Sequence, residues 1–407
     1  MIQLLKLAWR SLWRHRRRTI ITLSSIVMSL AIASFFITLA NGMYARMLFG
    51  VLRMQSGHLT IENPEYPDAP AIDLVVRHQH ELRDQIQRLD GVERTKAIVM
   101  GQGIASSGSA SVGVAVAGVE PKVESSLSPL VHQIRHGQYL DGQLRTAVVG
   151  AELARRLELG VGSKLVLSGN DRSGQLTQEM VRVRGIFETG SLDVDGHYVQ
   201  VPIDFARRLY GLGEDETTQV GVVIDNPRRQ KQLLGEVDRI VADRDAIALP
   251  WQKVLPELST FMRIDKGSNY VFQILIVVMA MFTIFNTLLM SVLERKREFA
   301  VMLALGTPPA RVKAQIFAEA AIMGALGIGL GLGLGALLAW VTNGYDFSSS
   351  MPDGFEVGGF LVEPRLYMHV DPQTLLWLGG TSFAAILLMT VVPLARIGSI
   401  KVTDAFR

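Results

Sequence analysis

The sequence predicts an α-helical membrane protein with four transmembrane helices and a large α+β extracytoplasmic domain between the first and second of them. The 407 residues are 48% hydrophobic and only 19% charged, which is little charge for a soluble chain of this length. The mean hydropathy is +0.26. Four uncharged, mostly apolar runs are each long enough to cross a hydrocarbon core of about 30 Å. They are residues 19–42, 268–293, 320–345 and 372–395.

Lysine and arginine in the short flanking segments predict the orientation of these spans, because both accumulate on the cytoplasmic side. Residues 1–18, the loop 294–319 and the tail 396–407 together hold 14 basic and 4 acidic residues, a net charge of +10. The whole chain carries +3, so the remainder carries −7. We therefore expect both termini and the 294–319 loop in the cytoplasm, with residues 43–267 and the shorter loop 346–371 outside. The pI of about 9.1 then reflects anchoring charge and does not indicate nucleic-acid binding.

Residues 1–18 are predicted to form an amphipathic helix on the cytoplasmic surface of the membrane. An apolar and a basic stripe follow different sides of this helix: Leu5, Trp9, Leu12 and Trp13, against Lys6, Arg10, Arg14 and Arg17. The helix either anchors the chain through its charge and tryptophans or braces the first span as an elbow. The run 19–42 exceeds the roughly 7–15 residues of a signal-peptide core, so we expect an uncleaved anchor.

Residues 43–267 mix strand and helix patterns, which predicts an α+β domain arranged in two lobes. Lys164–Leu167 and Glu179–Ile186 read as strands joined across a glycine-bounded turn. A helix is expected over Ala151–Leu159, closed by Gly160. Cysteine is absent from the chain, so the domain folds without disulfides and thiol chemistry is excluded.

The sequence carries no motif for catalysis, nucleotide binding or metal binding. The pattern G-x-x-x-x-G-K-[ST] does not occur, and two histidine pairs lack a third ligand at suitable spacing: His78 with His80, and His132 with His136. Asp193 and Asp195 lie in a glycine-bounded segment that is best interpreted as a solvated loop. The four spans contain no Asp, Glu, Lys, Arg or His, which disfavours an ion channel or a proton-coupled carrier.

The loop between the second and third spans is the most informative segment. Glu294–Leu305 is cationic at its start and helix-prone, and Gly306 with the prolines behind it ends the helix. A helix held against the cytoplasmic face of the membrane can be bound and displaced by another protein.

The third span carries glycines at a regular interval. Gly327, Gly331 and Gly335 form two successive G-x-x-x-G spacings, and Gly329 and Gly333 form another. Small residues at this interval let two helices approach closely, so the glycines at 327, 331 and 335 are predicted to pack against a neighbouring span.

The residues around this loop resemble a known family. The run Leu293–Gly306 (LERKREFAVMLALG), followed by Glu319 at the third span, resembles the signature of FtsX/MacB-type ABC permeases. The segment Pro393–Arg407 resembles the end of the same family. Where that family usually has proline or glutamate, this chain has Val402, Thr403 and Asp404.

Within the family, the chain is most similar to the lipoprotein-releasing permeases of the LolC/LolE type. Length, layout and the segments 185–190 (GIFETG) and 201–209 (VPIDFARRL) carry that similarity. The resemblance implies a MacB-like periplasmic core domain in a bacterial inner-membrane subunit that is not itself an enzyme. It also implies a complex with a second permease copy or a paralogue and two copies of a cytoplasmic ABC ATPase. ATP and Mg²⁺ bind to that ATPase, and no cofactor is expected in this chain.

The resemblance further implies that the helix of the 294–319 loop docks in a cleft of the ATPase. The implied charged contacts are Glu294, Arg295, Arg297 and Glu298. The remaining coupling residues are Phe299, Met302, Leu305 and Gly306.

A lipoprotein cargo would leave from the outer leaflet toward a periplasmic carrier or adaptor. The candidate lipid contacts lie near the outer ends of the first two spans: Phe35, Phe36, Met43, Tyr270 and Val271. An equal alternative is that these residues simply face membrane lipids.

Two further functions stay open. The chain is either a MacB-like efflux or export permease that drives a periplasmic adaptor, or an FtsX-like scaffold that activates a periplasmic enzyme and moves nothing.

Overall fold

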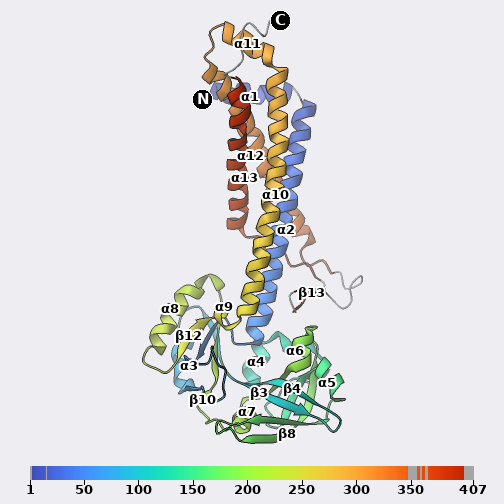
Figure 1. Cartoon of the computed structure of the whole chain (residues 1–407), viewed down its shortest axis with the longest axis vertical. Coiled ribbons are helices and arrows are strands. Elements are labelled where there is room, and N and C mark those ends of the chain that lie inside the picture. The colour runs from blue at the N-terminus through green and yellow to red at the C-terminus, as the bar shows by residue number, and fades with distance from the viewer. Residues whose placement is uncertain (1, 15, 347–354, 358–359, 363–364, 398–407) are drawn as a thin grey trace. The chain divides into compact units, whose positions relative to one another are not determined.

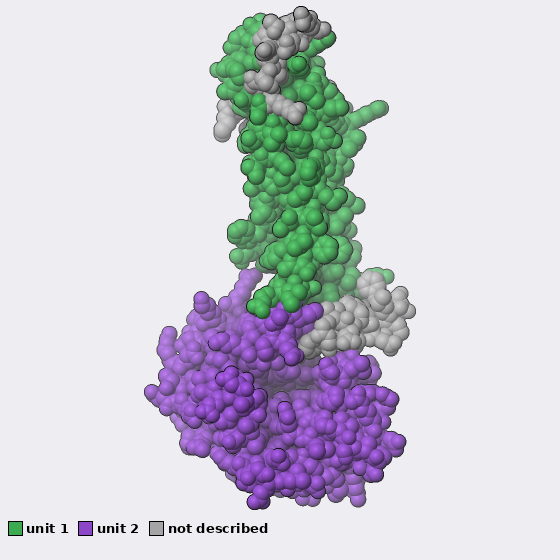
Figure 2. All heavy atoms as spheres, viewed as in Figure 1, with its two compact units in different colours: residues 1–45, 263–346, 365–407 green, residues 46–262, 347–364 purple. Residues whose placement is uncertain are grey.

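The computed structural model describes residues 2–14, 16–346, 355–357, 360–362 and 365–397. Residues 398–407 of the expected tail, and parts of the expected 346–371 loop, lie outside the described residues. The chain divides into two compact units, which are coloured separately in Figure 2. The helical unit contains Met1–Ala45, Arg263–Asp346 and Arg365–Arg407, and the sheet unit contains Arg46–Met262 and Phe347–Pro364.

The helical unit is built from four helices that are long and apolar enough to cross a membrane (Figure 1). They are α2 Arg16–Met54, α10 Pro256–Glu294, α12 Pro309–Thr342 and α13 Pro372–Ile397. Three contain an expected span in full, and α12 ends three residues before the expected end of the third span, so the predicted four-helix membrane part is confirmed. α2 and α10 have 39 residues each, about twice the length that a bilayer needs, because they continue as helix past their apolar runs.

Two shorter helices complete this unit: α1 Ile2–Arg14 and α11 Lys296–Ala304. A single apolar cluster joins α1, the four long helices and α11; its members include Leu12, Leu30, Leu288, Phe299, Ile316 and Ile386. Trp9 and Trp13 of α1 lie edge to face on its exposed side, 5.9 Å apart.

The sheet unit is α+β, as predicted, and follows the first span directly. Ten strands form one sheet in the order β12-β1-β11-β3-β4-β9-β6-β8-β5, and β7 pairs with β3 and β8. The strands are β1 Leu59–Glu62, β3 Val92–Ser106, β4 Ser111–Val119, β5 Ile134–Gly137, β6 Thr146–Gly150, β7 Lys164–Asn170, β8 Leu176–Phe187, β9 Tyr198–Pro202, β11 Gln219–Ile224 and β12 Ile247–Pro250. A separate pair joins β2 Val76–Arg77 to β10 Glu216–Thr217.

Seven helices accompany this sheet: α3 Gln79–Gln87, α4 Pro121–Leu127, α5 Ala151–Arg156, α6 Leu192–His197, α7 Ile203–Tyr210, α8 Gln230–Val241 and α9 Trp251–Val254. Two 3-10 turns, Pro129–Gln133 and Pro227–Arg229, lie between them.

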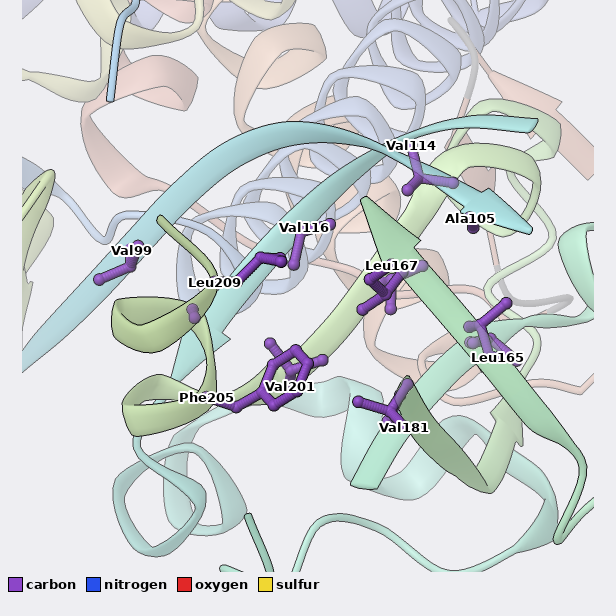
Figure 3. Packing of buried hydrophobic residues seen from close by; sticks show 14 of the residues in the cluster. Val99, Ala105, Val114, Val116, Leu165, Leu167, Val181, Val201, Phe205 and Leu209 are labelled. Atoms are coloured by element: carbon purple, nitrogen blue, oxygen red, sulfur yellow. The ribbon is translucent and has the colours of Figure 1, made fainter. Parts of the chain in front are cut away.

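Separate apolar clusters divide the sheet unit, although one sheet runs through all of them. The largest contains Val99 of β3, Val116 of β4, Leu167 of β7, Val201 of β9 and Phe205 of α7, which are labelled in Figure 3. A smaller cluster lies where α3 and α8 cover β1, β11 and β12, and contains Leu82 and Val237. A third cluster contains Met54, Ala117 and Phe187. The sheet is therefore continuous while its apolar packing is divided, and the division into two lobes stays a prediction.

Two local expectations need correction. α5 ends at Arg156 rather than Leu159, and Glu158, not Gly160, adopts the left-handed conformation, with φ of 54°. The segment around Asp193 and Asp195 is not a solvated loop but contains α6. Asp195 is buried there and accepts hydrogen bonds from the Thr189 and Gly190 N–H groups, which a period-based reading cannot detect. The expected strand pair of the hairpin is present as β7 and β8, extended to Asn170 and from Leu176.

His58, in the bend between α2 and β1, is buried and uncharged in the folded chain. Its Nδ1 accepts a hydrogen bond from the Ile224 N–H at 3.4 Å. Burial, helped by the positive charge of Arg53, lowers the pKa of His58 from 6.5 to about 4. Between pH 6.5 and 4 the imidazole of His58 is protonated in the unfolded chain but stays neutral in the folded chain. The free energy of unfolding therefore decreases as the pH falls through this range. The loss reaches about 3 kcal/mol near pH 4.

We therefore expect the thermal midpoint of the purified chain to drop between pH 6.5 and 4, and His58→Gln to flatten that drop. Glutamine can still accept from Ile224 but does not titrate. His136→Gln is the matched control, because His136 is exposed, and it should keep the parental pH profile. An unchanged slope in His58→Gln would show that another group causes the acid sensitivity.

Candidate functional site

Helix α11 is set apart from α10 and α12 by sharp local geometry. α10 ends at Glu294, and Arg295 (φ −96°, ψ 12°) leaves the helical conformation before α11 begins at Lys296. At the other end Gly306 has φ of +86°. Its N–H donates to Leu303 O and the Thr307 N–H donates to Met302 O, the bond pair of a glycine-closed helix end. The expected helix is therefore present, two residues shorter at its start and one at its end.

The inner face of α11 is buried in the helical unit. Phe299 and Ala300 have no exposed surface, and Phe299 belongs to the apolar cluster of the long helices. Met302 is partly buried and packs against the same cluster. Tertiary packing thus takes Phe299, the largest apolar side chain of the helix, inward, away from the surface that a partner would meet, and its role as a coupling contact stays a prediction.

The charged residues before and within α11 bind other parts of the helical unit. Arg295 Nη1 donates to Glu319 Oε1 at 3.0 Å and to Ser11 Oγ at 2.9 Å. Arg295 Nε also donates to Glu298 Oε2 at 3.0 Å, and only 11% of its side chain is exposed. Burial alone would lower the pKa of Arg295, but the two carboxylates outweigh it and raise that pKa, so the guanidinium stays charged. Arg295 thus joins α1, α11 and α12.

Two further ion pairs tie this region to the N-terminal segment. Arg14 Nη1 lies 3.3 Å from Glu298 Oε1, and Arg18 Nη1 lies 2.6 Å from Glu294 Oε2. Glu294, Arg295 and Glu298, expected as contacts for a partner, therefore already have partners within the chain. They hold α11 in place against the bundle.

The outer face of α11 is a mixed apolar and basic surface. It consists of Arg297, Val301, Ala304 and Leu305, which lie one and two helical turns apart and are all exposed. The side chains of Val301 and Leu305 are 45% and 82% exposed. We call these four residues the α11 outer face. Sequence reasoning found Arg297 and Leu305 but missed Val301, although its spacing of four from both was a signal for it.

The glycines of α12 form the second feature, a close helix contact within the helical unit. A Cβ on Gly327 would lie 2.5 Å from Ile26 Cγ2, and one on Gly331 would lie 2.8 Å from Leu30 Cβ. A Cβ on Gly335 would lie 2.6 Å from Ala31 O. All three neighbours belong to α2, so the backbones of α12 and α2 are in direct contact along this stripe. Gly329 and Gly333 instead face open space.

The candidate lipid contacts do not form one site. Phe36, Tyr270 and Val271 are exposed, whereas Phe35 and Met43 are partly buried. Of these five candidates, Tyr270 is the one that lines a groove of about 600 Å³ between α10 and α13. The groove is lined by Tyr270, Gln273, Ile274, Val277, Val278, Met281, Thr374, Trp377, Leu378 and Thr381. It is mostly apolar and thus suited to an acyl chain. Sequence reasoning missed Trp377, because no pattern indicates that α13 lies beside α10.

Comparison with protein families identifies two regions. A family model described as MacB-like periplasmic core domain matches residues 19–240, and one described as FtsX-like permease C-terminal matches residues 270–402.

Curated proteins similar to the chain include two from lipoprotein-releasing systems. The transmembrane protein LolE of Haemophilus influenzae is 22% identical over 319 residues, which are 75% of each chain. The transmembrane protein LolC of Neisseria meningitidis serogroup B is 24% identical over 259 residues, which are 61% of this chain and 62% of that protein.

Two solved structures are similar to the sheet-containing part of the chain in fold comparison. The periplasmic region of MacB from Actinobacillus actinomycetemcomitans is 11% identical with a TM-score of 0.36, covering 53% of this chain and 98% of that one. The extracellular domain of the ABC-type transporter YknZ from Gram-positive bacteria is 15% identical with a TM-score of 0.35, covering 47% and 98%.

Proposed function

This chain belongs to the family of ABC transporter permeases that join a MacB-like periplasmic core domain to an FtsX-like C-terminal part, and we propose that it transmits ATP-driven motion to release lipoproteins. Its place is the bacterial inner membrane, and permeases of this kind are non-catalytic subunits. ATP with Mg²⁺ is hydrolysed by a partner, a cytoplasmic ABC ATPase in two copies. A second permease copy or a paralogue completes the complex, and a periplasmic carrier or adaptor receives the cargo.

The observation that carries this proposal is the construction of α11. Its inner face is buried, and Glu294, Arg295 and Glu298 are bound within the chain, so a push on the helix moves the attached helices rather than bending a loop. Its outer face offers Val301 and Leu305 to a partner. The excess of basic residues supports a cytoplasmic location of this loop and both termini, on the side of the ATPase, with the sheet unit in the periplasm.

Lipoprotein release explains why such a permease needs ATP. Acyl chains are held in a membrane by about 0.8 kcal/mol per buried CH₂, so several chains sum to the order of tens of kcal/mol. Spontaneous release is negligible at that cost. The two relatives named for lipoprotein release support this cargo, and the groove with Tyr270 and Trp377 supports contact with an acyl chain.

The test is purification of the tagged chain from its native membrane, followed by reconstitution in liposomes. We expect an ABC ATPase to co-purify, and a diacylated or triacylated lipoprotein to leave the liposomes only when ATP is hydrolysed. A membrane-fusion adaptor in place of a lipoprotein carrier would favour the efflux function. A cell-wall hydrolase activated without any lipoprotein release would favour the scaffold function and overturn the proposal.

A further inference from the structure

The last turns of α2 are embedded in the sheet unit. Val51, Leu52 and Met54 are buried, and Met54 packs with Ala117 of β4 and Phe187 of β8 in one apolar cluster. A helix end leaves its final carbonyl groups without partners inside the helix. Buried as it is, this end needs donors from the sheet unit.

Lys96 of β3 supplies those donors. Its Nζ donates to Arg53 O at 2.8 Å and to Met54 O at 3.5 Å, both in the final turn of α2. The same Nζ lies 2.7 Å from Glu124 Oε1 on α4. The side chains of Lys96 and Glu124 are each only 1% exposed. One buried ammonium group therefore joins three elements: α2, β3 and α4.

The surrounding sheet is shaped for this contact. Lys96 pairs across the sheet with Gly221 of β11, and a Cβ on Gly221 would lie 2.5 Å from Ser56 O and 3.1 Å from Lys96 Cγ. Because Gly221 has no side chain, the aliphatic part of Lys96 and the backbone of Ser56 can pack directly against it. An ion pair from Arg53 to Glu93 adds a second link from α2 to β3.

Helix α10 is attached differently. It follows α9 and the edge strand β12, which pairs with β1, and the Trp251 N–H donates to His58 O at 3.1 Å. Ala246 and Ala248 at this attachment belong to the smaller apolar cluster of the sheet unit. The end of α2 and the strand that leads to α10 therefore belong to different apolar clusters of one domain. Among the contacts of the described residues, only the α2 end is bound to β3 and α4 through Lys96.

Buried ion pairs are poor stabilisers, because the cost of desolvating both charges offsets most of their attraction. Apolar residues of similar size usually keep or raise stability in such places. What apolar residues cannot do is donate to the carbonyl groups of α2. The hydrogen bonds from Lys96 to Arg53 O and Met54 O thus attach α2 to β3, which an apolar replacement would not do even if it kept the fold as stable.

We propose that Lys96, held by Glu124, is the positioning residue that passes displacement of α2 to the β3 and α4 part of the sheet unit. The inference rests on the proposed function, since it assumes that ATP hydrolysis moves α2 relative to α10. When α2 moves, the bound part follows it, while the part around β12 follows α10. The domain then opens or closes between the cluster that contains Met54 and the cluster that contains Ala248.

The test uses the double variant Lys96→Met/Glu124→Leu, which removes the donor and leaves no buried charge. A second variant, Lys96→Glu/Glu124→Lys, keeps an ion pair but puts an acceptor where α2 needs a donor. The matched control is Arg83→Met/Glu120→Leu, which removes another poorly exposed ion pair of the same unit, one without a bond to α2. The native chain has no cysteine, so two introduced cysteines can be labelled uniquely.

Spin labels at Ser125→Cys on α4 and Glu257→Cys at the start of α10, both exposed positions, report the distance between the two attachments. In the complex with its co-purified ATPase in nanodiscs, we expect ATP to change this distance in the parent and in the control. Both Lys96/Glu124 variants should lose the change while the rate of ATP hydrolysis stays at the parental value. Hydrogen exchange of the amides at 53–57 should rise about tenfold in both.

The outcomes separate the two claims. A parental distance change that persists in Lys96→Met/Glu124→Leu overturns the inference and leaves the proposed function standing. A parent whose distance does not respond to ATP overturns the proposed function, and the inference with it. Unchanged exchange at 53–57 in both variants also overturns the inference, because the carbonyl bonds would then not hold α2.

Discussion

A chain with Val301→Asp/Leu305→Asp is expected to insert and fold as the parent does but to lose its ATPase. Both side chains are exposed on the α11 outer face, so the change leaves the apolar cluster around Phe299 untouched. At an interface, each carboxylate would have to be desolvated opposite an apolar surface, which costs about 2 kcal/mol or more per site. Together the two changes should weaken binding about 1,000-fold. Co-purification of the ATPase and ATP hydrolysis by the complex are the measurements.

The matched control for this variant lies in the same loop. Ala310→Asp/Ala314→Asp introduces two carboxylates at the same spacing, at exposed positions on α12. If the partner docks on α11, this control should keep most of the ATPase. Equal loss in both variants would mean that negative charge anywhere in the loop repels the partner, and equal retention would remove α11 as the docking element.

The contrast with Phe299 shows which part of the site sequence can predict. Composition and the glycine and proline residues after Leu305 were enough to predict a helix here. They could not predict which face of α11 is buried, because the helix has two apolar faces of similar size. Packing against the other helices of the unit determines that the Phe299 face is the buried one. The partner charges of Arg295 and Glu294 lie on α12 and α2, far away in sequence, so the internal bracing was also hidden.

The membrane spans were predictable for a simple physical reason. A helix in lipid must satisfy its own backbone and present apolar side chains on every side, which leaves a long uncharged run in the sequence. The sheet carries no such signature. Its parallel pairs, β4 with β9 and β6 with β8, join segments distant in sequence, and no short-range pattern encodes them. Lys96 sits beside Arg94 in a strand that reads as solvated, yet it is among the most buried residues.

The second large effect is expected from valine on the packed glycines of α12. Gly331→Val/Gly335→Val should separate α12 from α2, because the new Cβ atoms would lie 3.0 Å from Val27 O and 2.6 Å from Ala31 O. Both neighbours are backbone atoms, so no side-chain rotation can relieve the overlap. Overpacking of this kind costs about 1–3 kcal/mol per site. We expect a lower thermal midpoint in detergent and, in the assembled complex, loss of ATP-driven release.

Gly329→Val/Gly333→Val isolates packing from every other effect of the substitution. It makes the same change, at the same spacing and in the same helix, at glycines whose Cβ positions meet nothing within 4 Å. The effect of valine on helix propensity is therefore common to both variants, and only the contact with α2 differs. The free energy of unfolding of the control should match that of the parent within about 1 kcal/mol. Gly329 and Gly333 are exposed, so valine at these positions displaces no packed neighbour. If both pairs lowered the thermal midpoint equally, the loss would come from the effect of valine on the helix itself and not from the contact with α2. Close packing of α12 against α2 would then not be needed for the complex to work.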